Sequence, residues 1–262
     1  MYPVLFRVGS FDVTSFGVLV ALAALFGLWL FRRELRLSGL PVEAGDVALI
    51  GALAGLAGAK LLWVLEHLGE EPATALLLSR AGMSWFGGFA GGLGAGLWTM
   101  KRRGWPILPV VSAAVPGLAL GHAIGRIGCF LVGDDYGTPS NLPWAVAFPE
   151  GSPPTIERVH PTQLYEAAAL IPIAGAMLRW RRRHVSDAWV VGAYLVSTGL
   201  LRFAIEFIRV NERVALGLTV AQWAALALSI AGAAFIFRAH AAGASVTTAD
   251  RSGRKQHVRA RG

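Results

Sequence analysis

Residues 13–31 read VTSFGVLVALAALFGLWLF, and two arginines, Arg32 and Arg33, follow them directly. The stretch has no charged side chain over a length close to the roughly 20 residues that a helix needs to cross a bilayer core. Positive charge at one end is typical of a membrane helix, because cytoplasmic flanks hold the excess of Lys and Arg. The acidic Asp12 before it does not fit the start of a cleavable signal peptide, so we expect this helix to be retained.

The composition of the whole chain agrees with a membrane protein. Of its 262 residues, 55% are hydrophobic and only 15% are charged, whereas soluble domains carry about 25% charged residues. The mean hydropathy of +0.54 also excludes a disordered chain. The single cysteine, Cys129, excludes a disulfide framework and any metal site built on several cysteines.

Six further stretches are long and nearly free of charge, so the sequence predicts seven membrane spans in all. They cover residues 47–65, 81–100, 104–125, 161–178, 188–208 and 214–237. The predicted fold class is therefore all-α, a polytopic membrane helix bundle of seven transmembrane helices within a domain at residues 1–240.

The positions of the basic residues predict the orientation of this bundle. Clusters of Lys and Arg follow the first, third, fifth and seventh stretches, which places the N-terminus outside and the C-terminus in the cytoplasm. Residues 241–262 are predicted to form a basic, disordered cytoplasmic tail. Its positive charge is expected to contact lipid headgroups, and we predict no nucleic acid partner.

Glycines recur every four residues within three of the stretches, which places them on one face of each helix. The series are Gly51 and Gly55; Gly88, Gly92 and Gly96; and Gly117, Gly121 and Gly125. Such a face lets two backbones approach closely, and helix packing is the favoured interpretation. A second interpretation is that Gly125 and Gly128 let the headgroup of a substrate approach the backbone.

Three ionisable residues at the end of the sixth stretch share one helix face. Arg202, Glu206 and Arg209 are spaced i, i+4 and i+7. Charged side chains at membrane depth are costly, which makes them functional candidates. Arg202 and Glu206 form either a structural ion pair or part of a binding site. Two arginines against one glutamate leave surplus positive charge, which favours an anionic partner.

The segment GRIGCFLVGDDYG at residues 125–137 opens the longest connection between the stretches. His122 lies one helical turn before Arg126, so the two share a face. A guanidinium at this position can hold a phosphate through paired hydrogen bonds. Asp134 and Asp135 lie in a glycine turn, where two carboxylates are more often solvated than bound to a metal, so we predict no metal site.

The segment HPTQLYE at residues 160–166 opens the fifth stretch. Pro161 suits the first turn of a helix, which puts His160 beside free N–H groups that attract anions. Gln163 and Glu166 share a face three residues apart. Glu166 lies inside the apolar boundary, so it should be paired or protonated, and it is a candidate general base or partner of a buried arginine.

These segments together resemble the prolipoprotein diacylglyceryl transferase family. GRIGCFLVGDDYG, HPTQLYE and the segment RFAIEFIR at residues 202–209 carry the resemblance. The segments GMSWFGG at residues 82–88 and SFGVL at residues 15–19 fit in order and spacing, and the resemblance extends to about Arg238. It implies a multi-pass enzyme of the bacterial inner (plasma) membrane.

The resemblance implies transfer of a diacylglyceryl group from phosphatidylglycerol to the lipobox cysteine thiol of a prolipoprotein signal peptide. It implies no cofactor. Together with the residue patterns it gives His160, Glu166, Arg202 and His122 as catalytic candidates. The substrate-binding candidates are Arg126, Gly125, Gly128, Asp134, Gly137, Gln163, Tyr165 and Glu206.

Four positions depart from the family pattern. Phe86 stands where the family usually has histidine, Phe16 and Thr198 where it has tyrosine, and Cys129 where it has asparagine. Phe86 and Thr198 are the usual proton-handling positions, so His160 or His122 is expected to be the base, oriented by Glu166. The alternative function is a non-catalytic paralogue that binds lipid or lipoprotein precursors.

Overall fold

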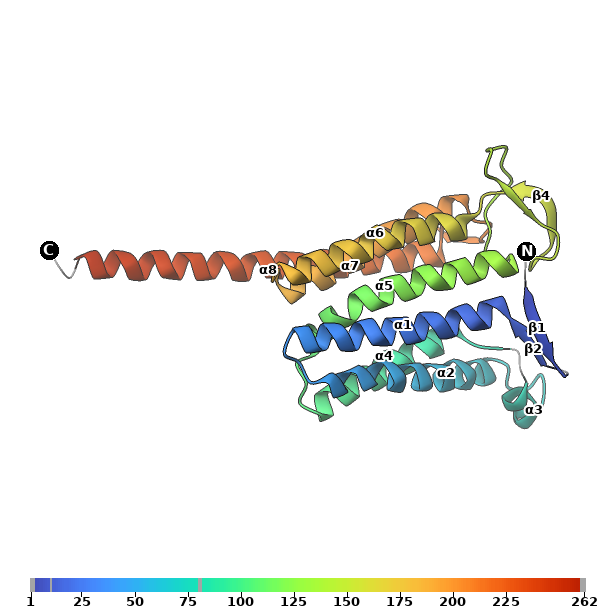
Figure 1. Cartoon of the computed structure of the whole chain (residues 1–262), viewed down its shortest axis with the longest axis horizontal. Helices are drawn as coiled ribbons and strands as arrows, with labels where there is room; N and C mark the ends of the chain where they lie inside the picture. Colours follow the sequence, from blue (N-terminus) through green and yellow to red (C-terminus); the bar gives the residue numbers. More distant parts are fainter. Residues whose placement is uncertain (1–2, 10, 80–81, 260–262) are drawn as a thin grey trace. The chain divides into compact units, whose positions relative to one another are not determined.

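A computed structural model describes residues 3–9, 11–79 and 82–259 of the protein (Figure 1). Side chains are described as far as Ala241, apart from those of Val8 and Phe11. The chain divides into two compact units. One is formed by Met1–Gly27 together with Ala114–Gly262, and the other by Leu28–Ala113.

Within the described residues, each of the seven predicted stretches overlaps one long helix. These helices are α1 (Ser15–Leu37), α2 (Asp46–Glu66), α4 (Trp85–Arg102), α5 (Ile107–Val132), α6 (Thr162–Arg182), α7 (Asp187–Ile205) and α8 (Val220–Arg259). Three short helical segments accompany them: η1 (Val42–Gly45), α3 (Ala73–Leu78) and η2 (Glu206–Ile208). The mostly helical fold is as predicted.

Five helical segments in the described part of the chain are long and apolar enough to cross a membrane. They are Ser15–Leu37, Val42–Glu66, Ile107–Val132, Asp187–Ile208 and Val220–Ala241. Helices α4 and α6 are not among them. Helix α4 is rich in glycine and ends in basic residues, and α6 has a buried glutamate and a basic last turn.

The described residues also form three short antiparallel hairpins, one before α1 and two between helices, a feature that the all-α prediction omitted. Strand β1 (Val4–Val8) pairs with β2 (Phe11–Thr14), β3 (Val146–Phe148) with β4 (Thr155–Val159), and β5 (Arg213–Ala215) with β6 (Leu218–Thr219). Backbone groups outside helices still need hydrogen-bond partners, and strand pairing supplies them.

Several helix boundaries differ from the predicted ones, and at two of them the backbone contains left-handed residues. The last span was expected from residue 214, but Leu216 and Gly217 have φ of 51° and 72° and turn the β5–β6 hairpin, so α8 begins at Val220. The fourth span was expected to end at residue 125, but α5 continues to Val132. Gly133, with φ of 73°, ends α5.

Helices α2 and α4 pack against each other through glycines. A Cβ atom added at Gly55 would lie 3.2 Å from the carbonyl oxygen of Gly88, and one at Gly58 would overlap the carbonyl of Gly87. Backbones at this separation leave no room for side chains. The packing interpretation of these glycine series is therefore confirmed.

The opposite face of α2 carries large apolar side chains that are exposed. Leu49, Leu53 and Leu56 follow one another at helical spacing, with 57–60% of their surface accessible. One face of the helix thus meets a protein partner and the other presents a continuous apolar surface. That division is what a helix between protein and lipid requires.

In the other unit, α7 packs beside α6 and α8 (Figure 1). Gly192 of α7 and Gly232 of α8 approach as closely as the glycines of α2 and α4: a Cβ at either would lie 2.6 Å from the other's carbonyl oxygen. Helix α8 extends to Arg259. The predicted disordered tail at residues 241–262 falls almost wholly beyond the described side chains and stays a prediction.

Candidate functional site

A small apolar cluster fixes the ends of three helices around the site. Ala123 of α5, with Ala167 and Leu170 of α6, is almost completely buried, and Leu201 of α7 packs against them. The charged residues of the site follow directly in the sequence: Arg126 lies one turn after Ala123, and Glu166 and Arg202 are neighbours of Ala167 and Leu201. The packing that joins the helices therefore also brings these charges together.

Arg126 connects α6 to the loop that follows α5. Its Nε donates a hydrogen bond of 2.8 Å to Oε2 of Glu166, and its Nη1 donates one of 2.7 Å to Oδ2 of Asp135. The guanidinium thus uses two edges for two carboxylates. Its side chain is 14% exposed.

Arg202 and Arg209 contact the same two carboxylates and also Glu206. Arg202 lies 3.5 Å from Oε1 of Glu166 through Nη1 and 2.8 Å from Oε2 of Glu206 through Nη2. Arg209 donates a hydrogen bond of 2.5 Å from Nη2 to Oδ1 of Asp135, and its Nε lies 3.9 Å from Oε2 of Glu206.

These contacts close into a ring in which positive and negative groups alternate. We call it the charge ring; its members, in order, are Arg126, Glu166, Arg202, Glu206, Arg209 and Asp135. Three arginines face three carboxylates, so the surplus of positive charge expected from residues 202–209 alone is balanced. The sequence argument was wrong here because it omitted partners that are distant in the chain.

The three carboxylates of the charge ring differ in their exposure. The side chains of Glu166 and Glu206 are 2% and 0% exposed, whereas that of Asp135 is 43% exposed. Glu206 also accepts hydrogen bonds of 2.7 Å from Asn211 and 2.9 Å from Thr219. Asp135 is therefore the carboxylate that an incoming anion reaches most easily.

The backbone of the loop after α5 is held by α6. Thr162 donates a hydrogen bond of 2.7 Å from its hydroxyl to the carbonyl oxygen of Asp135, and Gln163 donates from its amide to that of Asp134. Both donors are buried. The first turn of α6 thus sets the position of the loop. Thr162 and Gln163 of the HPTQLYE segment therefore act on the site by holding its backbone.

The two adjacent aspartates have pKa shifts of opposite sign. Burial would raise the pKa of Asp135, but hydrogen bonds from Arg209 and Arg126 outweigh it and lower that pKa to about 2. Burial raises the pKa of Asp134, and the negative charge of Asp135 raises it further. A hydrogen bond from Cys129 lowers this pKa but does not outweigh the burial. Asp134 was the predicted site residue, but the arginines hold Asp135.

The two candidate bases lie in different surroundings. His122 of α5 has its Nε2 3.8 Å from Oε2 of Glu166. His160 has its Nδ1 3.3 Å from the hydroxyl of Tyr165, which accepts a hydrogen bond of 2.7 Å from Trp144. Of the two histidines, His122 is the one in contact with the charge ring.

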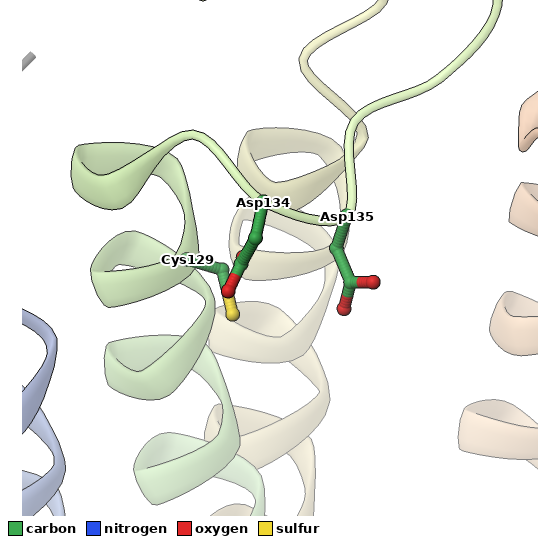
Figure 2. Close-up of side chains that lie close together, drawn as sticks. All are labelled: Cys129, Asp134 and Asp135. Atoms are coloured by element: carbon green, nitrogen blue, oxygen red, sulfur yellow. The ribbon is translucent and has the colours of Figure 1, made fainter. Parts of the chain in front are cut away.

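Cys129, Asp134 and Asp135 are the described residues whose side chains lie close enough to hold a metal ion. One ligand atom of each lies within 4.8 Å of the others, and in Figure 2 Cys129 and Asp134 point toward each other, with Asp135 next on the same loop. Both oxygens of Asp135, however, accept hydrogen bonds from arginines. A cation would compete with two guanidinium groups, so we assign no metal to this cluster.

Comparison with known proteins gives the family of the chain. The profile of the family described as prolipoprotein diacylglyceryl transferase matches residues 3–238. The chain belongs to the prolipoprotein diacylglyceryl transferase family. With five helices of membrane-spanning length and hydropathy, it is a membrane protein.

Relatives named phosphatidylglycerol–prolipoprotein diacylglyceryl transferase are similar over most of their length. The protein of Methylobacillus flagellatus is 33% identical over 88% of this chain and 93% of its own. That of Nitratidesulfovibrio vulgaris is 34% identical over 79% and 80%, and that of Clostridium tetani 29% identical over 81% and 87%.

Three glycines named from the family segments have different surroundings. A Cβ at Gly128 would lie 3.2 Å from the ring of Phe16, so this position packs against α1, whereas nothing lies within 4 Å of one at Gly125. A Cβ at Gly137 would meet His160 at 2.9 Å and overlap the carbonyl of Ile208. Only Gly125 has the open space that close approach of a ligand needs.

Two of the departures from the family pattern also have local roles. The hydroxyl of Thr198 donates a hydrogen bond of 2.7 Å to the carbonyl oxygen of Tyr194, one turn earlier in α7. Phe86 is exposed and packs edge-on against Trp85 within α4. Neither side chain carries a titratable group, so proton transfer in this chain needs other residues.

Sequence reasoning missed two members of the site, Asp135 and Arg209. Asp135 was expected to be a solvated turn residue, and Arg209 was placed on the helix face of Arg202 and Glu206 without being assigned a role in the site. Their ion pair joins residues 74 positions apart. The only sequence signal was the i, i+3 spacing of Glu206 and Arg209, which gives no partner outside its own segment.

Proposed function

We propose that the protein transfers a diacylglyceryl group from phosphatidylglycerol to the lipobox cysteine thiol of a prolipoprotein. The observation that carries this proposal is the charge ring, which places three arginines at the ends of membrane helices in a chain of this family. An anionic phosphate at the membrane surface is the group that such an arrangement binds.

The chemistry requires little covalent participation from the protein. The thiol sulfur of the substrate attacks the glyceryl carbon, a C–S bond forms, and the C–O bond to the phosphate breaks. Glycerol phosphate leaves with the negative charge, and the thiol proton passes to a base. The protein must therefore bind the phosphate, stabilise its developing charge and accept a proton.

Arg126 and Arg202 bind the phosphate in this proposal. An anion that replaces Asp135 gains the hydrogen bonds of Arg126, and Arg202, whose described ion pairs are with Glu166 and Glu206, contributes positive charge. Asp135 is the exposed carboxylate and lies on a loop, whereas Glu166 and Glu206 are buried within helices. The phosphate therefore displaces Asp135, which holds Arg126 and Arg209 in place while the site is empty.

His122 acts as the base in this proposal, and Glu166 orients it. The 3.8 Å between them is slightly longer than a hydrogen bond, and such contacts tighten when substrate excludes water. His160 holds the outer loop through Tyr165. A thiol with an unperturbed pKa of about 8.5 needs only modest activation beside cationic groups.

We further propose seven membrane spans in the bacterial inner membrane, with the N-terminus outside and the C-terminus in the cytoplasm. The five membrane-length helices and the long helices α4 and α6 give this number. The basic residues at the ends of α1, α4 and α6 support the orientation. The charge ring then lies at the outer surface.

The test is thioether formation by the purified protein in phosphatidylglycerol micelles with a synthetic lipobox peptide. Arg126→Ala and Arg202→Ala are expected to lower turnover by about 10²–10³. Arg213→Ala is the matched control, because this exposed arginine contacts only its own hairpin among the described hydrogen bonds. Full turnover in both ring variants contradicts the assignment, and lipid binding without turnover in the unmodified protein contradicts the proposed activity.

A further inference from the structure

A cavity with both charged and apolar lining residues lies in the loops next to the charge ring. It has a volume of about 410 Å³ and is bordered by residues 135–139, 152–159 and 209–211, all of which lie outside the helices. This volume is at the lower end of the roughly 300–1,000 Å³ of small-molecule pockets. It suits a short polar group and is too small for two acyl chains.

One wall of the cavity is a face of strand β4. Thr155, Glu157 and Val159 alternate along the strand and line the cavity, and Ile156 points away and is 87% exposed. Strand β4 pairs with β3 on one edge and bonds to the segment at Pro139 on the other. Both edges of β4 are therefore paired at Val159, and side chains of the strand line the cavity.

The cavity shares two residues with the charge ring, Asp135 and Arg209. Arg209 is more than nine-tenths buried, and its Nη1 is buried without a hydrogen-bond acceptor among the described residues. A buried guanidinium donor that lacks an acceptor is costly. An oxygen-bearing ligand at the junction of ring and cavity would supply one.

The order of groups along the structure matches the order of groups along a phospholipid. Apolar helices come first, the charge ring follows at their ends, and the cavity lies in the loops beyond. In a phospholipid the acyl chains are followed by the phosphate and then by the headgroup alcohol. With the phosphate on the charge ring, the next group outward enters the cavity.

We propose that this cavity binds the headgroup alcohol of the donor lipid, a small neutral polyol, and thereby selects the donor. The inference rests on the proposed function and adds the part of the substrate that is recognised. Hydroxyl groups donate to the carboxylate of Glu157 and accept from Arg209. Two carboxylates against one guanidinium disfavour an anionic headgroup.

Two soluble ligands test the proposal on the full-length protein in detergent. Glycerol phosphate carries both the phosphate and the polyol, and inorganic phosphate carries the anion alone. Calorimetric titration of the unmodified protein is expected to give an affinity for glycerol phosphate about tenfold higher, since two hydrogen bonds contribute about this much. Equal affinities, or no binding of either ligand, overturn the proposal.

Variants on the two faces of β4 locate the polyol. Glu157→Trp fills the cavity and Glu157→Gln removes a charge at nearly constant size; each is expected to remove most of the tenfold difference while inorganic phosphate binds as before. Ile156→Ser, on the opposite face of the same strand, is the control and keeps the difference. Retained preference in both Glu157 variants, with unchanged phosphate binding, places the polyol elsewhere.

Ligand titration tests the polyol subsite separately from the proposed transferase activity on which the inference rests. Ligand titration needs no peptide and no turnover. A protein that binds glycerol phosphate through the cavity but forms no thioether retains the subsite and loses the proposed activity. A protein that forms thioether with unaltered donor preference in both Glu157 variants retains the activity and loses the subsite.

Discussion

Two regions of the molecule hold segments of the chain together by opposite means. One is the contact between α2 and α4, and the other is the charge ring. At α2–α4 two backbones meet because side chains are absent, as at Gly55 and Gly88. In the charge ring, arginine and carboxylate side chains meet at 2.5–3.9 Å. The first contact depends on the shape of the backbone and the second on a balance of charge.

This difference predicts where each kind of substitution acts. Close backbone packing is intolerant of added atoms, so changes there lower stability. A ring of paired charges is weak support for stability, because the loss of hydration offsets much of the attraction. Two of its arginines hold the exposed carboxylate of Asp135, which another anion can replace, so changes there should first affect binding and turnover.

The largest expected effect is loss of turnover in Arg126→Lys. Lysine keeps the charge but cannot present two edges to Glu166 and Asp135. We expect kcat/KM to fall by about 10²-fold or more, with a melting temperature close to that of the unmodified protein. Initial rates of thioether formation check this, with Arg213→Lys as the control. Equal losses of stability and turnover would mean that the ring is mainly structural.

Gly58→Ala tests the close backbone packing of α2 against α4. The added Cβ overlaps the carbonyl of Gly87, and such overpacking costs about 1–3 kcal/mol. The protein should unfold at lower temperature while the folded fraction keeps its turnover. Gly94→Ala on α4 is the matched control, because nothing lies within 4 Å of its added Cβ. Equal melting temperatures in the two variants contradict packing through Gly58.

Asp135→Asn is expected to change affinity by a smaller amount. Removing the exchangeable carboxylate leaves Arg126 and Arg209 without the anion that competes with phosphate. The KM for phosphatidylglycerol should fall by about two- to fivefold, within the range of exposed ion pairs. Asp12→Asn removes an exposed carboxylate paired with Arg7 and serves as the control. A higher KM in Asp135→Asn would mean that Asp135 supports binding.

The smallest expected effect is on the pH dependence of stability. The pKa of Asp135 is about 2 in the folded protein and about 3.9 when unfolded. Its contribution is therefore present above about pH 4 and decreases as the pH falls toward 2. Asp134 has a raised pKa, so its effect has the opposite sign and is unfavourable above its unfolded pKa.

Thermal melts between pH 3 and pH 7 distinguish the two aspartates. Asp135→Asn should lose more stability at pH 7 than at pH 3, because the contribution of the carboxylate declines as the pH falls from about 4 toward 2. Asp134→Asn should show the reverse trend, since it removes a carboxylate that the fold prefers to protonate. Parallel curves for the two variants contradict the difference in their surroundings.

The positions of the helices could be predicted because each depends on its own residues. Apolar stretches of membrane length mark α1 and α2 without reference to any partner. Helix ends were predicted less well. Hydropathy does not distinguish Val132 from the residues before it, and only the left-handed backbone at Gly133 ends α5 there. The hairpin before α8 was missed because residues 214–219 are as apolar as the helix that follows.

The sequence by itself determined the apolar spans, the glycine faces and the i, i+4 pair of Arg202 with Glu206, because each lies within one segment of regular geometry. Tertiary structure alone decided that Asp135 joins Arg126 to Arg209 and closes the charge ring. The reason is physical: hydropathy and helical spacing act over a few residues, whereas a charge interacts with whatever the fold brings near it. The residues of single segments could be interpreted from the sequence alone, whereas the balance of charge in the site depends on residues that are distant in the sequence.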